Sequence, residues 1–201
     1  MKSTSILYLF LLLFLSNTSF AQTSVDDPEI KKMISEVKSE NMEATVRKLV
    51  SFGTRHTLSD TKSNIRGIGA AQRWVKSEFD KYASLSNGRL TSKIDFFTIK
   101  ADGKRIATDS QLGNVMATLK GTDGADNRVM IISGHLDSRA SDVMDSKIDA
   151  PGANDDASGV AAMMELARIM SKREFPFTLI FVAVVGEEQG LYGAKHLADV
   201  A

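Results

Sequence analysis

Residues 177–185 read Phe-Thr-Leu-Ile-Phe-Val-Ala-Val-Val, the most apolar run of the chain after its N-terminal segment. Polar and apolar side chains do not alternate in this run, which is typical of a strand covered on both faces of a sheet. Residues 186–190, Gly-Glu-Glu-Gln-Gly, follow it directly. The sequence therefore predicts a central β-strand that ends in two adjacent carboxylates.

Two further polar clusters accompany this one. The apolar run 129–133, which we interpret as a second buried strand, precedes Gly-His-Leu-Asp at residues 134–137. Residues 151–159 read Pro-Gly-Ala-Asn-Asp-Asp-Ala-Ser-Gly and open a predicted helix over 157–172. Ligands of open α/β sheets bind outside the carboxyl ends of the strands. One His and several carboxylates at such an edge make a metal site the first hypothesis.

The rest of the pattern predicts an α/β fold with helices on both sides of the sheet. Apolar residues at helical spacing favour helices that begin at Pro28, over 42–52, over about 66–82 and from 191 onward. A period of two favours a strand from Leu90, a hairpin at Asp102-Gly103 that returns along 104–107, and a strand over 114–119. The strand–helix–strand order of the second half favours a mixed, mostly parallel sheet.

Composition narrows the classes of function. The chain has 201 residues, of which 43% are hydrophobic and 25% charged, as is ordinary for one globular domain. The 25 Lys and Arg residues balance the 25 Asp and Glu residues, so no surface for nucleic acid or anionic membrane is indicated. There is no cysteine, which excludes disulfides and thiolate-bound zinc. Any metal must be held by His and carboxylate side chains.

The N-terminal segment is typical of a secretory signal. Lys2 precedes an apolar run over 6–15, and Ser19-Phe20-Ala21 places small residues at a cleavage site. The run is shorter than the roughly 20 residues that span a bilayer. We expect a signal peptide over 1–21, a mature domain over 22–201 with no membrane association after cleavage, and a secreted or periplasmic location.

The site residues also have ordinary structural interpretations. A lone His is more often structural than a ligand, but Asp137 lies two residues after His135 and a metal-bound imidazole usually donates its other N–H to a carboxylate. Asx residues such as those at 154–156 cap helices, although capping needs only one of them. Glu187 and Glu188 end the most buried strand, where two charges are costly unless they are paired or metal-bound. One of the two can bind a metal while the other acts on its water as general base.

Together these clusters resemble the M28 family of secreted zinc aminopeptidases. The resemblance rests on the residues that surround the three clusters, 133–138, 152–159 and 186–193, and on the upstream segments 51–57 and 113–115. It covers nearly all of the mature chain. It implies a three-layer, phosphorylase/hydrolase-like α/β/α sandwich, here C-terminally incomplete. The implied activity is the hydrolysis of N-terminal residues from peptides that have a free N-terminus.

The resemblance also implies a centre of two zinc ions. Asp155 corresponds to the carboxylate that bridges both ions, His135 to a ligand of one and Glu188 to a ligand of the other. Glu187 corresponds to the general base that deprotonates the bridging water, and Asp137 to the residue that orients His135.

A cis peptide bond is often found after the bridging carboxylate of this family, here between Asp155 and Asp156. The family needs two further ligands, an Asp and a His, which we expect beyond residue 201. His196 and Asp199 come too early to match, and we interpret them as surface residues, while His56 is interpreted as structural. Because these ligands are missing, we expect residues 22–201 alone to be inactive. We also expect one face of the strand over 177–185 to be exposed, because the elements that would cover it are missing.

Two other functions remain open. One is a glutaminyl-cyclase-like transferase, which shares the fold and uses a single zinc ion. The other is a catalytically inactive, metal-free binding domain of the same fold. The cluster over 154–159 resembles the peptidase form and favours the aminopeptidase.

The signal segment makes a prediction about the exported protein. Because the apolar run ends before Ser19-Phe20-Ala21, the mature protein is expected to begin at or near Gln22. N-terminal sequencing of protein from the periplasm or the medium measures this. An exported protein that still begins at Met1 would refute the assignment.

Overall fold

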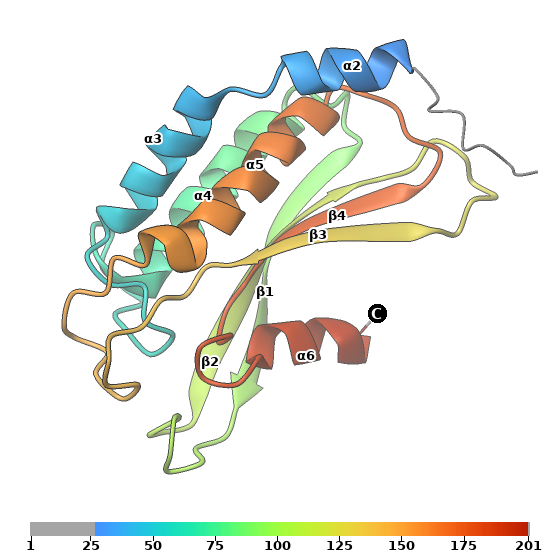
Figure 1. Cartoon of the computed structure of the whole chain (residues 1–201). Coiled ribbons are helices and arrows are strands. Elements are labelled where there is room, and N and C mark those ends of the chain that lie inside the picture. The colour runs from blue at the N-terminus through green and yellow to red at the C-terminus, as the bar shows by residue number, and fades with distance from the viewer. Residues whose placement is uncertain (1–26, 201) are drawn as a thin grey trace, which may run out of the picture. The chain divides into compact units, whose positions relative to one another are not determined.

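The computed structural model of the chain describes residues 27–200 (Figure 1). The predicted signal segment lies outside these residues, so its cleavage stays a prediction. The described residues divide into two units, with the boundary between Lys32 and Met33. Of the first unit the structure describes residues 27–32, which include the start of helix α2 (Pro28–Ser35). Among the described helices, none is long and apolar enough to cross a membrane.

The helices of the second unit form close to where the apolar spacing predicts them. They are α3 (Ser39–Val50), α4 (Gly67–Ala83), α5 (Ser158–Met170) and α6 (Tyr192–Val200), with a short π-helical turn, η1 (Ala153–Ala157), before α5. The predicted apolar stripe of α4 is confirmed, because its members Ile68, Ala71, Val75 and Phe79 are all buried.

The described residues form one mixed sheet of four strands in the order β1-β2-β4-β3. The strands are β1 (Leu90–Ile99), β2 (Ser110–Leu119), β3 (Val129–His135) and β4 (Thr178–Val184). β4 lies between β2 and β3, so the predicted central strand is confirmed. The sheet is mixed as predicted, but it is not mostly parallel within these strands. β3 and β4 are parallel, whereas β2 is antiparallel both to β1, with which it forms a hairpin, and to β4.

Helices cover both faces of the sheet and give the predicted three layers (Figure 1). α4 packs on β1 and β2, and α5 packs on β3 and β4, while α6 contacts β2 from the other side. Alternate side chains of β4 therefore enter two clusters. Phe181 packs towards α4 and α5, and Val182 and Val184 pack with Leu197 of α6. The expectation that the far face of β4 is bare is thus wrong, because α6 folds back over it.

Three consecutive exposed apolar side chains lie on β3. Val129, Met130 and Ile131 are 52%, 53% and 47% exposed, so the prediction that this strand is buried is wrong for its first half. In the described sheet β3 is an edge strand that pairs with β4 on one side. α5 covers it near its end, where Gly134 is buried. Whether an apolar strand is buried depends on the elements that pack beside it. The sequence pattern of the strand alone does not predict those elements.

The hairpin also differs from the prediction. The strand that returns from β1 is β2, with Ile99 opposite Ser110, and residues 104–107 belong to the turn. Asp102 organises this turn, because its Oδ1 atom accepts the main-chain N–H groups of Lys104, Arg105 and Ile106, each at 2.8 Å. These backbone hydrogen bonds lower the pKa of Asp102 to about 2. The Asp102 carboxylate thus accepts main-chain N–H groups that a return strand over 104–107 would need for pairing with β1. These residues therefore form part of the turn.

The end of β3 lies against the start of α5 at a glycine. A Cβ atom added to Gly134 would lie 2.7 Å from the Val160 nitrogen and 2.8 Å from the Gly159 carbonyl carbon. Both are main-chain atoms, so the neighbouring element itself would have to shift. Glycine at 134 therefore lets the strand that carries His135 contact the helix that follows η1.

We predict that Gly134→Ala lowers the free energy of unfolding by about 1–3 kcal/mol, the usual cost of overpacking. The matched control is Gly124→Ala, where an added Cβ meets nothing within 4 Å. The control is expected to stay within about 0.5 kcal/mol of the wild type. Urea unfolding of both variants measures the difference, and equal stabilities would show that β3 and α5 are not in close contact.

Candidate metal centre

The parallel pairing of β3 and β4 brings two of the three clusters together. His135 is the last residue of β3 and stands opposite Val184, the last residue of β4. The Leu136 N–H continues the pairing by donating to the Val184 carbonyl at 2.7 Å. Glu187 and Glu188 follow β4 within four residues. The His and the two Glu residues therefore emerge at one edge of the sheet.

The third cluster reaches the same edge through η1. The peptide bond between Asp155 and Asp156 is cis, as the resemblance implied. Asp156 ties the turn to both neighbours, since its carboxylate accepts the His135 N–H at 3.0 Å and the Gly159 N–H at 2.9 Å. Asp156 thus closes the first turn of α5, which leaves Asp155 with its side chain 75% exposed and available for another role.

Polar groups of three residues surround the His135 ring. The Nε2 atom lies 2.8 Å from Asp155 Oδ1 and 4.0 Å from Glu187 Oε2. The Nδ1 atom lies 3.1 Å from the Asp137 main-chain carbonyl and 3.8 Å from Asp137 Oδ1, so the carbonyl of Asp137 is the nearer group. Burial opposes protonation of the ring, but the carboxylates of Asp137, Asp156 and Glu187 outweigh it and raise the pKa of His135.

The Asp137 carboxylate is fully buried and holds the loop after β4. Its Oδ1 atom accepts the Glu187 N–H at 3.3 Å, and its Oδ2 atom accepts the Glu188 N–H at 3.1 Å. The Oδ2 atom also accepts the Thr57 hydroxyl at 2.9 Å. Asp137 therefore connects the His cluster to the Glu cluster, a role that the spacing of His135 and Asp137 does not reveal.

Glu188 has a cationic partner that the sequence analysis missed. Its side chain is 13% exposed, and its Oε2 atom lies 2.9 Å from Arg139 Nε. Burial and the charge of Asp155 raise the pKa of Glu188, while Arg139 opposes the rise. Asp155 and Glu188 are thus close enough to repel each other, and the guanidinium of Arg139 compensates part of that repulsion.

Three other polar residues were considered as possible ligands in the sequence, and none of them belongs to this group of side chains. They are His56, His196 and Asp199. His56 is buried as expected, where Nδ1 accepts the Leu58 N–H at 3.0 Å and Nε2 lies 2.9 Å from the Val143 carbonyl. His196 is less exposed than expected, because it stacks on Phe97 with 4.3 Å between ring centroids. Asp199 is exposed, as expected.

The side chains at the carboxyl ends of β3 and β4 are of the types that bind zinc. Zinc binds imidazole nitrogen and carboxylate oxygen, and His135 Nε2 and Asp155 Oδ1 already face each other. Glu188 is turned towards Arg139. Within residues 27–200, no group of three or more His, Asp or Glu side chains is arranged to hold a metal ion. The described residues thus fit part of a zinc site, with His135 Nε2 and Asp155 Oδ1 as two possible ligand atoms.

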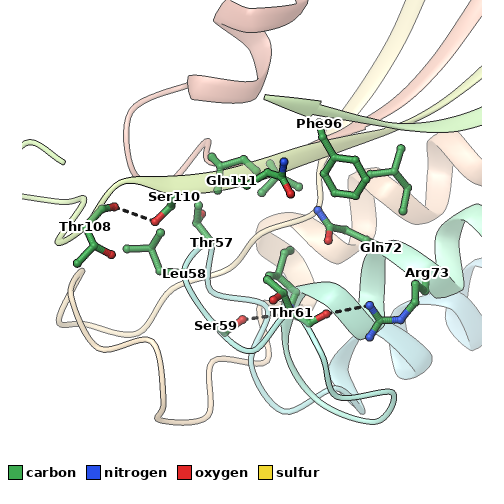
Figure 2. Close-up of a pocket in the computed structure, with 14 residues that line it drawn as sticks. Thr57, Leu58, Ser59, Thr61, Gln72, Arg73, Phe96, Thr108, Ser110 and Gln111 are labelled. Carbon is green, nitrogen blue, oxygen red and sulfur yellow. Dashed lines mark hydrogen bonds between the residues drawn. The ribbon is translucent and has the colours of Figure 1, made fainter. Parts of the chain in front are cut away.

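A cavity of about 710 Å³ lies beside this edge, between the loop before α4 and the hairpin of β1 and β2. Figure 2 shows Thr57, Gln72, Phe96 and Gln111 around it. None of the predicted site residues lines it. Thr57 is the link, because it lines the cavity and its hydroxyl reaches Asp137.

Comparison with known proteins supports the same interpretation. Residues 114–201 match the family model of peptidase family M28. A relative from Pyrenophora teres f. teres, named "Probable zinc metalloprotease", is 49% identical over 173 residues. The aligned region covers 86% of this chain and 35% of that relative, so the chain spans about a third of the relative's length. The resemblance to peptidase family M28 is confirmed.

Solved structures show that the M28-like chain has the expected fold. The aminopeptidase from Aneurinibacillus sp. strain AM-1 superposes with a TM-score of 0.64 at 18% identity, covering 85% of this chain and 68% of that one. The glutaminyl cyclase of Fimbriiglobus ruber gives a TM-score of 0.60 at 20% identity, covering 80% and 54%. Both likenesses concern the α/β/α architecture.

Upstream of the range matched by the M28 model, Arg55 joins the loops that carry the site. The side chain is fully buried. Its guanidinium donates to the carbonyls of Leu136 at 2.8 Å, Pro151 at 2.7 Å, Gly152 at 3.0 Å and Leu49 at 3.2 Å. The planar fork of an arginine can serve several acceptors at once, which a lysine cannot do. Arg55 thereby holds the loop after β3 against the loop before η1.

Arg55 also supplies buried positive charge. Burial lowers the pKa of Arg55 to about 10, although the nearby carboxylates of Asp137 and Asp156 oppose this effect and favour the charged form. The side chain therefore stays protonated at neutral pH. In the sequence, the segment 51–57 shows only the family resemblance, and no local pattern indicates that Arg55 points inward.

We predict that Arg55→Met lowers the free energy of unfolding by at least about 3 kcal/mol, because it leaves buried carbonyls unpaired and two carboxylates without compensation. The control is Arg47→Met, which removes an exposed ion pair with Glu43 and is expected to cost about 1 kcal/mol or less. Urea unfolding compares them. If Arg55→Met costs no more than the control, Arg55 does not hold the two loops together.

Proposed function

We propose that the protein is a metal-dependent exopeptidase that removes N-terminal residues from peptides. The observation that carries this proposal is the convergence of three side chains at the carboxyl ends of β3 and β4. His135 Nε2 lies 2.8 Å from Asp155 Oδ1 and 4.0 Å from Glu187 Oε2. An imidazole ligand, a carboxylate ligand and a further carboxylate are the groups that metal-assisted hydrolysis uses.

In this proposal each site residue has a distinct role. His135 and Asp155 would hold one zinc ion, and Asp155 and Glu188 would hold a second. Bound zinc supplies Lewis acidity that lowers the pKa of water to about 7 and polarises the scissile carbonyl. Glu187 would accept the proton of the attacking water and return it to the amine that leaves when the peptide bond breaks, and Asp137 would orient His135 and the loop that carries Glu187.

The described residues supply only part of the ligands that this centre needs. Catalytic zinc usually has three protein ligands and a water. His135 with Asp155, and Asp155 with Glu188, give two protein ligands to each ion. The chain spans about a third of its relative from Pyrenophora teres f. teres. We propose that an Asp and a His beyond residue 201 complete the centre, and that residues 22–201 alone are inactive.

The substrate and the location belong to the same proposal. A cation centre at an open strand edge can anchor the free α-amine of a peptide, which makes a peptide with a free N-terminus the substrate. The apolar segment at residues 6–15 supports export, and we propose that the protein acts outside the cytoplasm.

A glutaminyl-cyclase-like transferase is the second candidate. It is favoured by the TM-score of 0.60 to the glutaminyl cyclase of Fimbriiglobus ruber. The full-length protein should be assayed with aminoacyl-nitroanilides and with a peptide that begins with glutamine, each with and without a chelator. We expect release of nitroaniline that the chelator abolishes. Cyclisation of glutamine without that release would support the transferase, and neither activity would support a metal-free binding domain.

Substitution of the proposed base tests the assignment of roles. Glu187→Gln in the full-length protein is expected to keep the bound zinc and to lower kcat by about 10²–10⁴-fold, because glutamine cannot accept the proton. Asp155→Asn is the contrast and is expected to lower the zinc content, because its carboxylate is proposed to bridge both ions. Elemental analysis beside kinetics measures both effects. Wild-type kcat in Glu187→Gln would remove Glu187 from the mechanism.

A further inference from the structure

Thr57 lies at the point where the upstream segment meets the candidate site. It is buried, and it precedes by more than fifty residues the range 114–201 that the family model matches. Its hydroxyl donates to Asp137 Oδ2 at 2.9 Å. The same hydroxyl contacts the carboxamide of Gln189, which lies in the loop after β4 and is also buried. Thr57 thus touches both loops that carry site residues.

The Thr57 hydroxyl limits how the Asp137 carboxylate can turn. The Oδ2 atom accepts the Thr57 hydroxyl and the Glu188 N–H, and the Oδ1 atom accepts the Glu187 N–H. These three donors come from two directions, one from the upstream segment that carries Thr57 and two from the main chain after β4. With the hydroxyl present, rotation of the carboxylate breaks a hydrogen bond to a buried acceptor, which is costly.

The orientation of Asp137 sets the geometry of the groups around it. Its Oδ1 atom faces His135 Nδ1 at 3.8 Å, and its main-chain carbonyl lies 3.1 Å from the same nitrogen. The other ring nitrogen of His135 is the proposed zinc ligand. Groups that contact a ligand in this way fix its orientation, and their loss typically weakens metal binding.

We propose that Thr57 is a positioning residue for the zinc centre, acting through Asp137 on His135 and on the turn that carries Glu187. The inference rests on the proposed function, because it assumes that His135 binds zinc. It adds a residue from the segment 51–57 to a site whose proposed ligands and base all lie between residues 135 and 188.

The test compares three variants of the full-length protein. Thr57→Val keeps the shape and removes the hydroxyl, and Thr57→Ser keeps the hydroxyl. Thr54→Val is the matched control, because Thr54 is equally buried in the same loop and its hydroxyl accepts the His56 N–H at 3.1 Å. Zinc affinity is measured by competition with a chromophoric chelator, alongside kcat, KM and the melting temperature.

Thr57→Val is expected to weaken zinc binding by about 10–100-fold and to lower kcat with KM little changed. Thr57→Ser should restore both. Thr54→Val should lower the melting temperature without changing the zinc affinity. Such a pattern separates positioning from loop stability, since a purely structural role would move Thr57→Val and Thr54→Val alike.

Two results would overturn the inference. One is a Thr57→Val protein that binds zinc as tightly as the wild type, and the other is a Thr57→Val protein that does not fold, which would make Thr57 structural. Both are distinct from failure of the proposed function, which is a wild-type protein that does not bind zinc at all.

Discussion

The candidate site depends on the buried carboxylate of Asp137. A charge without solvent is tolerated only where hydrogen bonds and opposite charge replace the water. Here the donors are the Thr57 hydroxyl and the main-chain N–H groups of Glu187 and Glu188, and the cation of Arg55 lies near enough to interact with it. Because these donors come from different parts of the chain, the hydrogen bonds to the Asp137 carboxylate also hold the loops of the site together.

The same edge carries negative charge that the protein itself only partly compensates. Burial and the charge of Asp155 raise the pKa of Glu188, and three carboxylates outweigh burial and raise the pKa of His135. Arg139 pairs with Glu188 and offsets part of this repulsion. A cation bound between Asp155 and Glu188 would offset more of it, and would replace the guanidinium of Arg139 as the partner of Glu188. The electrostatics therefore favour a bound cation, in agreement with the proposed centre.

The sequence was sufficient for the features that depend on local pattern. The apolar run over 177–185 identified β4 as the central strand, and the polar clusters after two apolar runs located the edge where His135 and Asp155 meet. The helix that follows the Asp cluster was also predicted. Each of these rests on residues that are neighbours in the chain, or on the rule that parallel strands deliver their carboxyl ends to one edge.

Features that depend on distant partners could not be predicted. Thr57 and Asp137 are 80 residues apart, and nothing in either neighbourhood indicates that they meet. Whether the start of β3 is buried depends on what lies beside it, so its apolar pattern was misleading. The hairpin was misplaced because the side chain of Asp102 binds the backbone of residues 104–106 in the turn.

The most direct test of this account is a crystal structure of the full-length protein grown with zinc, with anomalous diffraction recorded at the zinc absorption edge. The account predicts one anomalous peak about 2.0–2.2 Å from His135 Nε2 and from a carboxylate oxygen of Asp155. It predicts a second peak between Asp155 and Glu188, with the side chain of Arg139 turned away from Glu188. A zinc-loaded protein without an anomalous peak beside His135 would contradict it.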